Sequence, residues 1–391
     1  TMKALRERMN LTLNVDHVNN KKNTVVRRTM NDSTKRIRET SEMAFNSQYK
    51  LAGEVMESNH TGMRVLWGTR MKDGMEVVVK VRSRANSFKK SSEEREWRAT
   101  TEVQMNMPPT ATICQLLEVV ATKANYYVVM EKVEGKDLFE HMDEDQVKQE
   151  DTREVVYQVL EALNFLHSQG RIHKDLKLEN VMVNMNAPKE PSSPGTKSRS
   201  LSPGASRSLE QWSSEGSQQT SPGVKLIDFD TVENWQPQKQ AHSVLGSNGY
   251  IAPEAYLGEY SPASDIFCAG VIMYKLLTRH FPYALDMFDD RPGENYVGSS
   301  AMRRIHARLK NEQVDFSRFP FDRCPEAADL CSRMLKPDAQ QRPSAEEALK
   351  HIWFQLLPEE LDPRQTTVNW ETTPAPSLQF PTTSVGLPNR V

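Results

Sequence analysis

The segment from His173 to Asn180 reads HKDLKLEN and places an acid, a lysine and an amide close together in the chain. The Asp175 carboxylate can accept the proton of a hydroxyl group. Lys177 can neutralise phosphate charge, and the Asn180 amide oxygen can bind a hard metal ion. These residue types at these spacings indicate the chemistry of phosphoryl transfer.

Four further motifs accompany this segment in a defined order. Two precede it, VVVK at Val77 to Lys80 and YYVVMEKVEGKDLF at Tyr126 to Phe139, and two follow it, LIDFD at Leu226 to Asp230 and GYIAPE at Gly249 to Glu254. Together with HKDLKLEN they resemble the eukaryotic protein kinase superfamily, serine/threonine type, from about residue 49 to residue 354. The later segment MLKPDAQQRPSAEEALKHIWF is most similar to the calcium/calmodulin-dependent kinase branch.

The resemblance implies an α+β, bilobal protein-kinase fold, with a small antiparallel sheet lobe that holds one helix and a larger, mainly helical lobe. The sequence patterns agree with it. Apolar periodicity or continuous apolar character predicts helices at Glu93–Met107, Asp151–His167 and Ser264–Leu277. Alternating or β-branched stretches predict the strands of the small lobe, Lys50–Val55, Met63–Trp67, Glu76–Val81, Cys114–Val120 and Tyr126–Glu131.

Composition predicts how the rest of the chain is organised. Residues 1–48 are expected to form a basic, disordered arm, because Thr1 to Thr40 hold ten basic and four acidic residues and few large apolar side chains. The two lobes would cover residues 49–131 and 132–356. The tail, residues 357–391, repeats Pro and Thr and is also expected to be unstructured.

A segment rich in Ser, Pro and Gly interrupts the larger lobe. Residues 187–223 lack the apolar side chains needed to offset the entropy of chain ordering, so we predict a disordered insertion. It separates the apolar runs Val181–Val183 and Val224–Ile227, which predict the two strands of one hairpin. Several of its serines precede proline, so upstream kinases are expected to act on it.

Charge and cysteine content exclude several classes of protein. The net charge of −2 gives no argument for binding to nucleic acid or to a membrane surface. The four cysteines show no CxxC or Cys/His pairing, so neither zinc nor a disulfide framework is expected. No apolar run approaches the length of a membrane span, and the start lacks the apolar core of a signal peptide. The expected location is the cytoplasm or the nucleus.

The resemblance assigns roles to the polar residues of the motifs. Asp175 would be the catalytic base, Lys177 would contact the transferred phosphate, and Lys80 would hold the α- and β-phosphates of ATP. Asn180 and Asp228 would be the ligands of Mg²⁺, which prefers oxygen donors. ATP and Mg²⁺ are therefore the expected cofactors.

In the family, the lysine also pairs with a glutamate of the following helix. Two residues compete for this role. Glu102 precedes Ile113 by about the family distance, whereas Glu96 shares a helical face with apolar residues, and we favour Glu102. Other expected contacts of ATP are Val65, Met130, Glu131, Val133 and Asp137.

The glycine-rich loop of the family is degenerate in this chain. Counting back from Lys80 makes Val65 the residue that closes the loop, and the three glycine positions then fall on Ser58, His60 and Met63. Glycine lets backbone amides approach phosphate closely. We therefore expect this loop to bind ATP less tightly.

Two further departures lie close to the catalytic motifs. Lys174 stands where most of the family has arginine, which makes a two-pronged contact with a phosphorylated activation loop, whereas lysine offers a point charge. Asp230 stands where the family has glycine. Two readings stay open for Asp230: it stiffens the segment or alters metal affinity, or it is a tolerated variant that points to solvent.

The activation segment, Asp228 to Glu254, and its surroundings predict how a protein substrate binds. Ser243 lies where related kinases carry a regulatory phosphosite, so an upstream kinase is an expected partner there. Asp137 and Glu179 predict a preference for basic residues upstream of Ser or Thr, unless both are only solvated charges. The walls of a pocket for the apolar residue after the phosphoacceptor are expected to be Val244, Leu245 and Ile251.

Three residues of the larger lobe match structural positions of the family. Asp265 is expected to tie the catalytic loop to its neighbouring helix, and Glu254 is expected to form an ion pair with Arg342. The chain is predicted to be a serine/threonine protein kinase. The alternative is a pseudokinase scaffold, which the degenerate loop supports and the retained Lys80 and Asp175 oppose. A kinase acting on small molecules is disfavoured by the GYIAPE motif.

Overall fold

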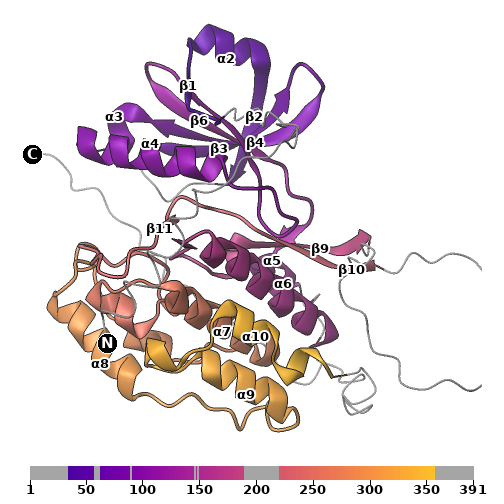
Figure 1. The fold of residues 1–391 in the computed structure, drawn as a ribbon, viewed down its shortest axis with the longest axis vertical. Helices are drawn as coiled ribbons and strands as arrows, with labels where there is room; N and C mark the ends of the chain where they lie inside the picture. Colours follow the sequence, from indigo (N-terminus) through magenta and orange to yellow (C-terminus); the bar gives the residue numbers. More distant parts are fainter. Residues whose placement is uncertain are drawn as a thin grey trace, which may run out of the picture. The chain divides into compact units, whose positions relative to one another are not determined.

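The computed structural model describes residues 34–56, 62–88, 90–144, 147, 149–188 and 220–356. The chain divides into two compact units, residues 1–35 and 36–391. All elements named below belong to the second unit, in which a sheet-rich part precedes a helix-rich part (Figure 1). The predicted α+β fold is confirmed.

The sheet-rich part is built on six strands in the order β1-β5-β6-β4-β3-β2. Strands β2 to β6 confirm the five predicted antiparallel strands, whereas β1 is an unpredicted sixth strand that runs parallel to β5. The sequence does not reveal β1 because two residues are too few to show alternation. The strands are β1 (Arg38–Glu39), β2 (Tyr49–Met56), β3 (Met63–Arg70), β4 (Met75–Ser83), β5 (Leu116–Ala121) and β6 (Asn125–Glu131).

The predicted disorder of residues 1–48 is wrong for the end of that segment. Helix α2 (Glu42–Gln48) follows β1 and packs on the sheet (Figure 1). Its Phe45 is fully buried and stacks on Tyr127, with ring centroids 3.8 Å apart. One aromatic anchor and a few charge contacts hold this segment, and a count of charges does not reveal such contacts. Residues 1–33 lie outside the described residues.

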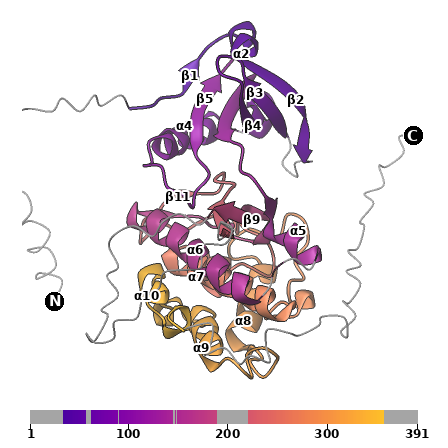
Figure 2. The same cartoon turned by 90° about the vertical axis from the view of Figure 1, so that its right-hand side faces the viewer.

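Helix α4 (Ser91–Met105) runs beside the sheet and contacts β5 (Figures 1 and 2). It confirms the helix predicted for residues 93–107, with its ends shifted by two residues. Its buried residues are Thr101 and Met105, which lie one turn apart on the same face. A short helix, α3 (Arg84–Ser87), precedes it.

The helix-rich part is organised around α7 (Pro262–Thr278), which is buried from Ser264 to Thr278 as its apolar sequence predicts. Helix α6 (Gln149–Ser168) packs against it (Figure 2). The apolar positions predicted for α6 are all buried, namely Val155, Val156, Val159, Leu160, Leu163 and Leu166. The other α-helices of the described part are α5 (Leu138–Asp143), α8 (Ser300–Asn311), α9 (Pro325–Met334) and α10 (Ala345–Leu349).

Strands β9 (Val181–Pro188) and β10 (Thr220–Leu226) form the predicted hairpin, with β7 (Lys136–Asp137) on its β9 side. Their pairing extends outward until Pro188 lies opposite Thr220. The predicted insertion, residues 187–223, is therefore too long at both ends, because backbone pairing does not require apolar side chains. Residues 189–219 lie outside the described residues.

Two short strands join the catalytic loop to the activation segment. Strand β8 (Arg171–Ile172) precedes HKDLKLEN, and β11 (Glu233–Asn234) follows LIDFD and pairs with it in antiparallel fashion. None of the helices in the described ranges is both long and apolar enough to cross a membrane. The predicted tail, residues 357–391, falls outside these ranges.

Candidate active site

Asp265 of α7 shapes the loop that follows β8. Its buried carboxylate accepts hydrogen bonds from the backbone N–H groups of His173 (2.8 Å) and Lys174 (2.9 Å), and the His167 ring lies 2.9 Å away. Burial alone would raise the pKa of Asp265, but His167 and these hydrogen bonds hold it below its ordinary value. The predicted tie between Asp265 and the catalytic loop is confirmed.

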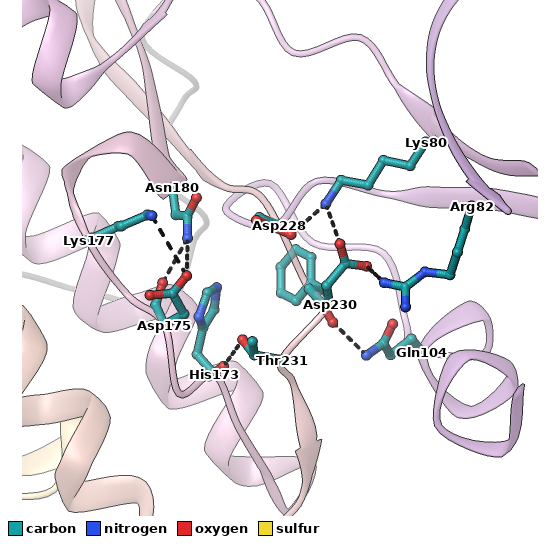
Figure 3. A network of polar contacts seen from close by, with 11 residues as sticks. Lys80, Arg82, Gln104, His173, Asp175, Lys177, Asn180, Asp228, Asp230 and Thr231 are labelled. Carbon is teal, nitrogen blue, oxygen red and sulfur yellow. Dashed lines mark hydrogen bonds and ion pairs between the residues drawn. The ribbon is translucent and has the colours of Figure 1, made fainter. Parts of the chain in front are cut away.

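Asp175 lies beside two side chains that can orient an acceptor hydroxyl. Ser247 Oγ donates to Asp175 Oδ1 (3.0 Å), and Lys177 Nζ donates to Ser247 Oγ (3.1 Å) and lies 3.8 Å from Asp175 Oδ2. Asn180 Nδ2 donates to the Asp175 carbonyl oxygen (2.7 Å) (Figure 3). Burial raises the pKa of Asp175, although Lys177 and Ser247 oppose the shift. The sequence analysis missed Ser247, because one serine in a loop carries no pattern.

Lys80 of β4 lies opposite Val65 of β3, so two of the predicted ATP contacts are neighbours in the sheet. The Lys80 side chain is buried and forms ion pairs with Asp228 and, at 3.1 Å, with Asp230 (Figure 3). Burial alone would lower the pKa of Lys80, but the charges of Asp230 and Asp228 outweigh it and raise the pKa. Lys80 is therefore positively charged in the site.

The predicted pairing of Lys80 with a glutamate of the following helix is wrong. Glu102 pairs with Arg36 (3.7 Å), and Glu96 is exposed and lies 3.8 Å from Lys239. The physical reason is that α4 turns neither glutamate toward β4. The partner of Glu102 comes from the segment before α2, whose ordered structure the sequence does not reveal.

Asp228 adopts a left-handed backbone conformation with a φ of +63°, which is uncommon for a residue other than glycine and typical of functional segments. Its carboxylate contacts Lys80 and accepts a hydrogen bond from the Asp230 backbone. Burial would raise the pKa of Asp228, but the charge of Lys80 outweighs it and lowers the pKa. Gln104 of α4 fixes the next residue by donating to the Phe229 carbonyl oxygen (3.0 Å).

The donors in this site fit a magnesium ion. Asn180 uses its amide nitrogen on the Asp175 backbone, which leaves its oxygen available, and Asp228 supplies an ionised carboxylate. Within the described residues no group of three or more His, Cys, Asp or Glu side chains could hold a metal. Phosphate oxygens and waters would therefore complete the coordination shell, as is usual for Mg²⁺ at nucleotide sites.

Comparison with known proteins identifies the family. A family model described as the protein kinase domain matches residues 61–354. The chain belongs to the protein kinase family. The match begins inside the degenerate loop, so Ser58 and His60 precede the matched residues and Met63 lies within them.

Several curated kinases are similar to this kinase domain. Sperm motility kinase Z of Mus musculus is 25% identical over 64% of this chain and 41% of that protein. Calcium-dependent protein kinase 8 of Arabidopsis thaliana is 27% identical over 66% of this chain and 40% of that protein. MAP kinase-interacting serine/threonine-protein kinase mnk-1 of Caenorhabditis elegans is 28% identical over 81% of this chain and 43% of that protein. The chain thus spans about two fifths of the length of these relatives.

Four of the predicted ATP contacts lie along the segment that runs from the end of β6 to the residue before α5. Met130 packs against the core of the sheet-rich part, and the Glu131 side chain accepts a hydrogen bond from Lys225 (2.6 Å). Val133 is half-buried, and Asp137 caps α5. Lys225 engages the Glu131 side chain and the Glu131 N–H donates to the Gln115 carbonyl oxygen (3.0 Å), so the roles of these residues in ATP binding stay predictions.

The glycine-rich loop of the kinase domain is described only in part. Ser58 and His60 lie outside the described residues. Met63 is buried in β3, and Gly62 beside it has a φ of +79°, which favours glycine. The prediction of weak ATP binding by this loop therefore stays a prediction.

Lys174 finds its partner within the activation segment. Its buried ammonium lies 3.3 Å from Glu233 and 4.7 Å from the centre of the Tyr260 ring. Burial lowers the pKa of Lys174, and Glu233 opposes this shift. Glu233 also pairs with Lys239 (2.9 Å). The sequence analysis missed Glu233, whose carboxylate gives Lys174 a negatively charged partner.

The predicted apolar pocket beside the activation segment has partly different walls. A cavity of about 360 Å³ is lined by Val244, Ile251 and Met302, but also by polar residues that include Asn248, Asp290, Arg291 and Asn295, so it is not purely apolar. Leu245 does not line it and is 39% exposed, because successive residues of an extended segment point to opposite sides. The Val244 N–H donates to the Asn295 carbonyl oxygen (2.7 Å), so the loop before α8 supports this wall.

The end of the activation segment is anchored as predicted. Arg342 donates to both carboxylate oxygens of Glu254, each at 2.8 Å, and stacks over the Phe267 ring at 4.9 Å. A buried two-pronged pair of this kind fixes geometry well, and removing one partner would leave a buried charge. The predicted Glu254–Arg342 pair is confirmed.

Proposed function

We propose that this kinase domain transfers the γ-phosphate of ATP to Ser and Thr hydroxyl groups of proteins. The observation that carries the proposal is the cluster of Asp175, Lys177 and Ser247, with Asn180 hydrogen-bonded to the Asp175 backbone. Asp175 orients the acceptor hydroxyl and takes its proton. Lys177 neutralises charge on the phosphate in transfer.

The nucleotide would bind between this cluster and β4. Lys80 would contact the α- and β-phosphates, and Asn180 and Asp228 would hold Mg²⁺. The bound ion would neutralise phosphate charge. The raised pKa of Asp175 suits proton abstraction, because a stronger base takes the hydroxyl proton more readily while it stays ionised near neutral pH.

We further propose a modest preference for substrates with basic residues upstream of the phosphoacceptor. Glu179 Oε2 is buried and has no hydrogen-bond partner in the described part of the chain. Burial raises the pKa of Asp137, and the nearby charge of Glu179 adds to that shift. A cationic substrate side chain would relieve both carboxylates. Lys275 limits the preference, because its charge already acts on Glu179.

Regulation and location are proposals of the same kind. Ser243 is exposed, so an upstream kinase could reach it, and the serines of the insertion are further targets. The four cysteines are buried free thiols, which suits a reducing compartment such as the cytoplasm or nucleus. Phosphopeptide mapping and fractionation of cells that express the protein would test both proposals.

The main proposal is tested by comparing wild type with Asp175→Asn. The variant should lose at least about a hundredfold in kcat and keep its affinity for a non-hydrolysable ATP analogue, because the amide preserves shape but cannot accept the proton. The pH–rate profile of the variant's residual activity should lack the acidic limb that the wild-type profile shows. Equal, measurable rates for the two proteins would refute Asp175 as the base, and rates at background level for both would favour a pseudokinase scaffold.

A further inference from the structure

The buried lysine of the nucleotide site takes its ion pairs from a single segment. Within the described residues, the salt bridges of Lys80 go to Asp228 and Asp230. A buried ammonium group requires such pairing, because its desolvation is costly. Asp228 is also the expected metal ligand, so its carboxylate cannot serve Lys80 and Mg²⁺ equally. A second carboxylate is needed to keep Lys80 paired when the metal is bound.

Helix α4 does not supply that carboxylate. Glu94 pairs with Arg84 at 2.8 Å, Glu96 is exposed, and Glu102 pairs with Arg36. The buried face of α4 presents Thr101, whose side chain is short and uncharged. Gln104 lies one turn further along and reaches the Phe229 carbonyl oxygen, so this face of the helix does adjoin the LIDFD segment.

Asp230 is fixed from several directions. Its Oδ2 lies 3.1 Å from Lys80 Nζ, and its Oδ1 lies 3.5 Å from Arg82, the next residue on the same face of β4 (Figure 3). Arg82 in turn stacks on Trp97 of α4, with its guanidinium 5.2 Å from the ring centre. Thr231 Oγ1 donates to the carbonyl oxygen at residue 173 (2.8 Å) and holds the backbone just after Asp230.

We propose that Asp230 is the positioning residue that holds Lys80 in place for the phosphates of ATP, in the role that a helix glutamate has elsewhere in the family. This inference rests on the proposed kinase function. Of the two alternatives that the sequence left open for Asp230, the one in which its side chain points to solvent is wrong, because its carboxylate bridges Lys80 and Arg82 of β4. The arrangement places the partner of Lys80 in the activation segment itself, one residue after Phe229.

The test compares variants of Asp230 in the full chain by two measurements. One is the affinity for a fluorescent, non-hydrolysable ATP analogue with Mg²⁺, and the other is the kinetics of phosphate transfer. Asp230→Asn should weaken binding of the analogue and raise the KM for ATP by about tenfold, with a smaller effect on kcat. Asp230→Glu should keep most of the affinity, because it retains the charge. Glu102→Gln is the matched control on α4 and should bind the analogue like wild type.

A rescue experiment separates positioning from a general structural effect. In the Asp230→Gly background, Thr101→Glu should recover analogue affinity, because it places a carboxylate on the α4 face beside the LIDFD segment. Wild-type affinity in Asp230→Asn would overturn the proposal. A change confined to the Mg²⁺ concentration needed for half-saturation would overturn it as well, and would make Asp230 a metal ligand. Weaker analogue binding in Asp230→Asn together with no transfer by wild type would keep this inference and reject the proposed function.

Discussion

Glu233→Gln tests whether the activation segment is anchored without phosphorylation. The change keeps the shape of the side chain and removes the charge that faces Lys174. Lys174 is nearly buried and lies within reach of a second cation, Lys239, which also pairs with Glu233. Without the carboxylate, Lys174 keeps the ring of Tyr260, at 4.7 Å, and the charge of Asp265 as favourable interactions.

The size of the effect follows from burial. Removing one partner of a fully buried pair costs about 3–5 kcal/mol, and an exposed pair contributes less than about 1 kcal/mol. The Lys174 and Glu233 side chains are 5% and 23% exposed, which places this pair between the two limits. We expect a loss of about 2 kcal/mol from the attachment of the segment. If this attachment limits the active population, kcat/KM falls by up to about thirtyfold.

The assay measures phosphate transfer and thermal unfolding for Glu233→Gln, Ser243→Ala and Glu96→Gln. Glu96 is the matched control, because it also lies near Lys239 but is 74% exposed. We expect a large loss of activity for Glu233→Gln and activity within about twofold of wild type for the other two variants. Full activity of Glu233→Gln combined with loss of activity in Ser243→Ala would refute the reasoning and make a phosphate the anchor.

Three further predictions concern stability, the insertion and the glycine-rich loop. Lys275→Met should raise Tm at pH 7. Burial lowers the folded-state pKa of Lys275 to about 8, although Glu179 opposes this shift, so below pH 8 the folded state bears the full cost of a buried charge. The expected advantage of the variant at pH 7 is about 1–2 kcal/mol, after allowance for the contact of Lys275 with the Phe281 ring at 3.7 Å. Between pH 8 and 10.5 the folded state loses the Lys275 proton before the unfolded state does, so wild type gains stability and this advantage should vanish. A difference in Tm that stays constant with pH would contradict the shift. Replacing residues 189–219 with an Asn-Gly turn should leave Tm nearly unchanged, because β9 and β10 already pair up to that point, and a large drop in Tm would show that the segment packs on the domain. Replacing Ser58, His60 and Met63 with glycine should lower the KM for ATP. An unchanged KM would show that the loop binds phosphate in another way.

The catalytic side of the site could be predicted from the sequence because its residues are close in the chain. Asp175, Lys177 and Asn180 lie in one loop, so their spacing already reports their proximity. Asp265 and the Glu254–Arg342 pair are distant in sequence, and only the resemblance to a family revealed them.

The partner of Lys80 could not be predicted in the same way. Helical spacing shows which α4 residues share a face, but it does not show how the helix is rotated against the sheet. That rotation leaves Thr101 buried and Glu102 paired with Arg36. The ordered segment before β2 was missed for a related reason, since it is held by Phe45 and by paired charges rather than by a periodic apolar pattern.

The central claim is that this domain transfers phosphate, with Asp228 essential for that transfer. The most direct measurement is transfer of radiolabelled γ-phosphate from ATP to a mixed Ser/Thr peptide library that contains basic residues, for wild type and for Asp228→Asn. The account predicts labelling of Ser and Thr by wild type and at least about a hundredfold less labelling by the variant. Labelling by wild type that does not rise above the Asp228→Asn background would contradict it.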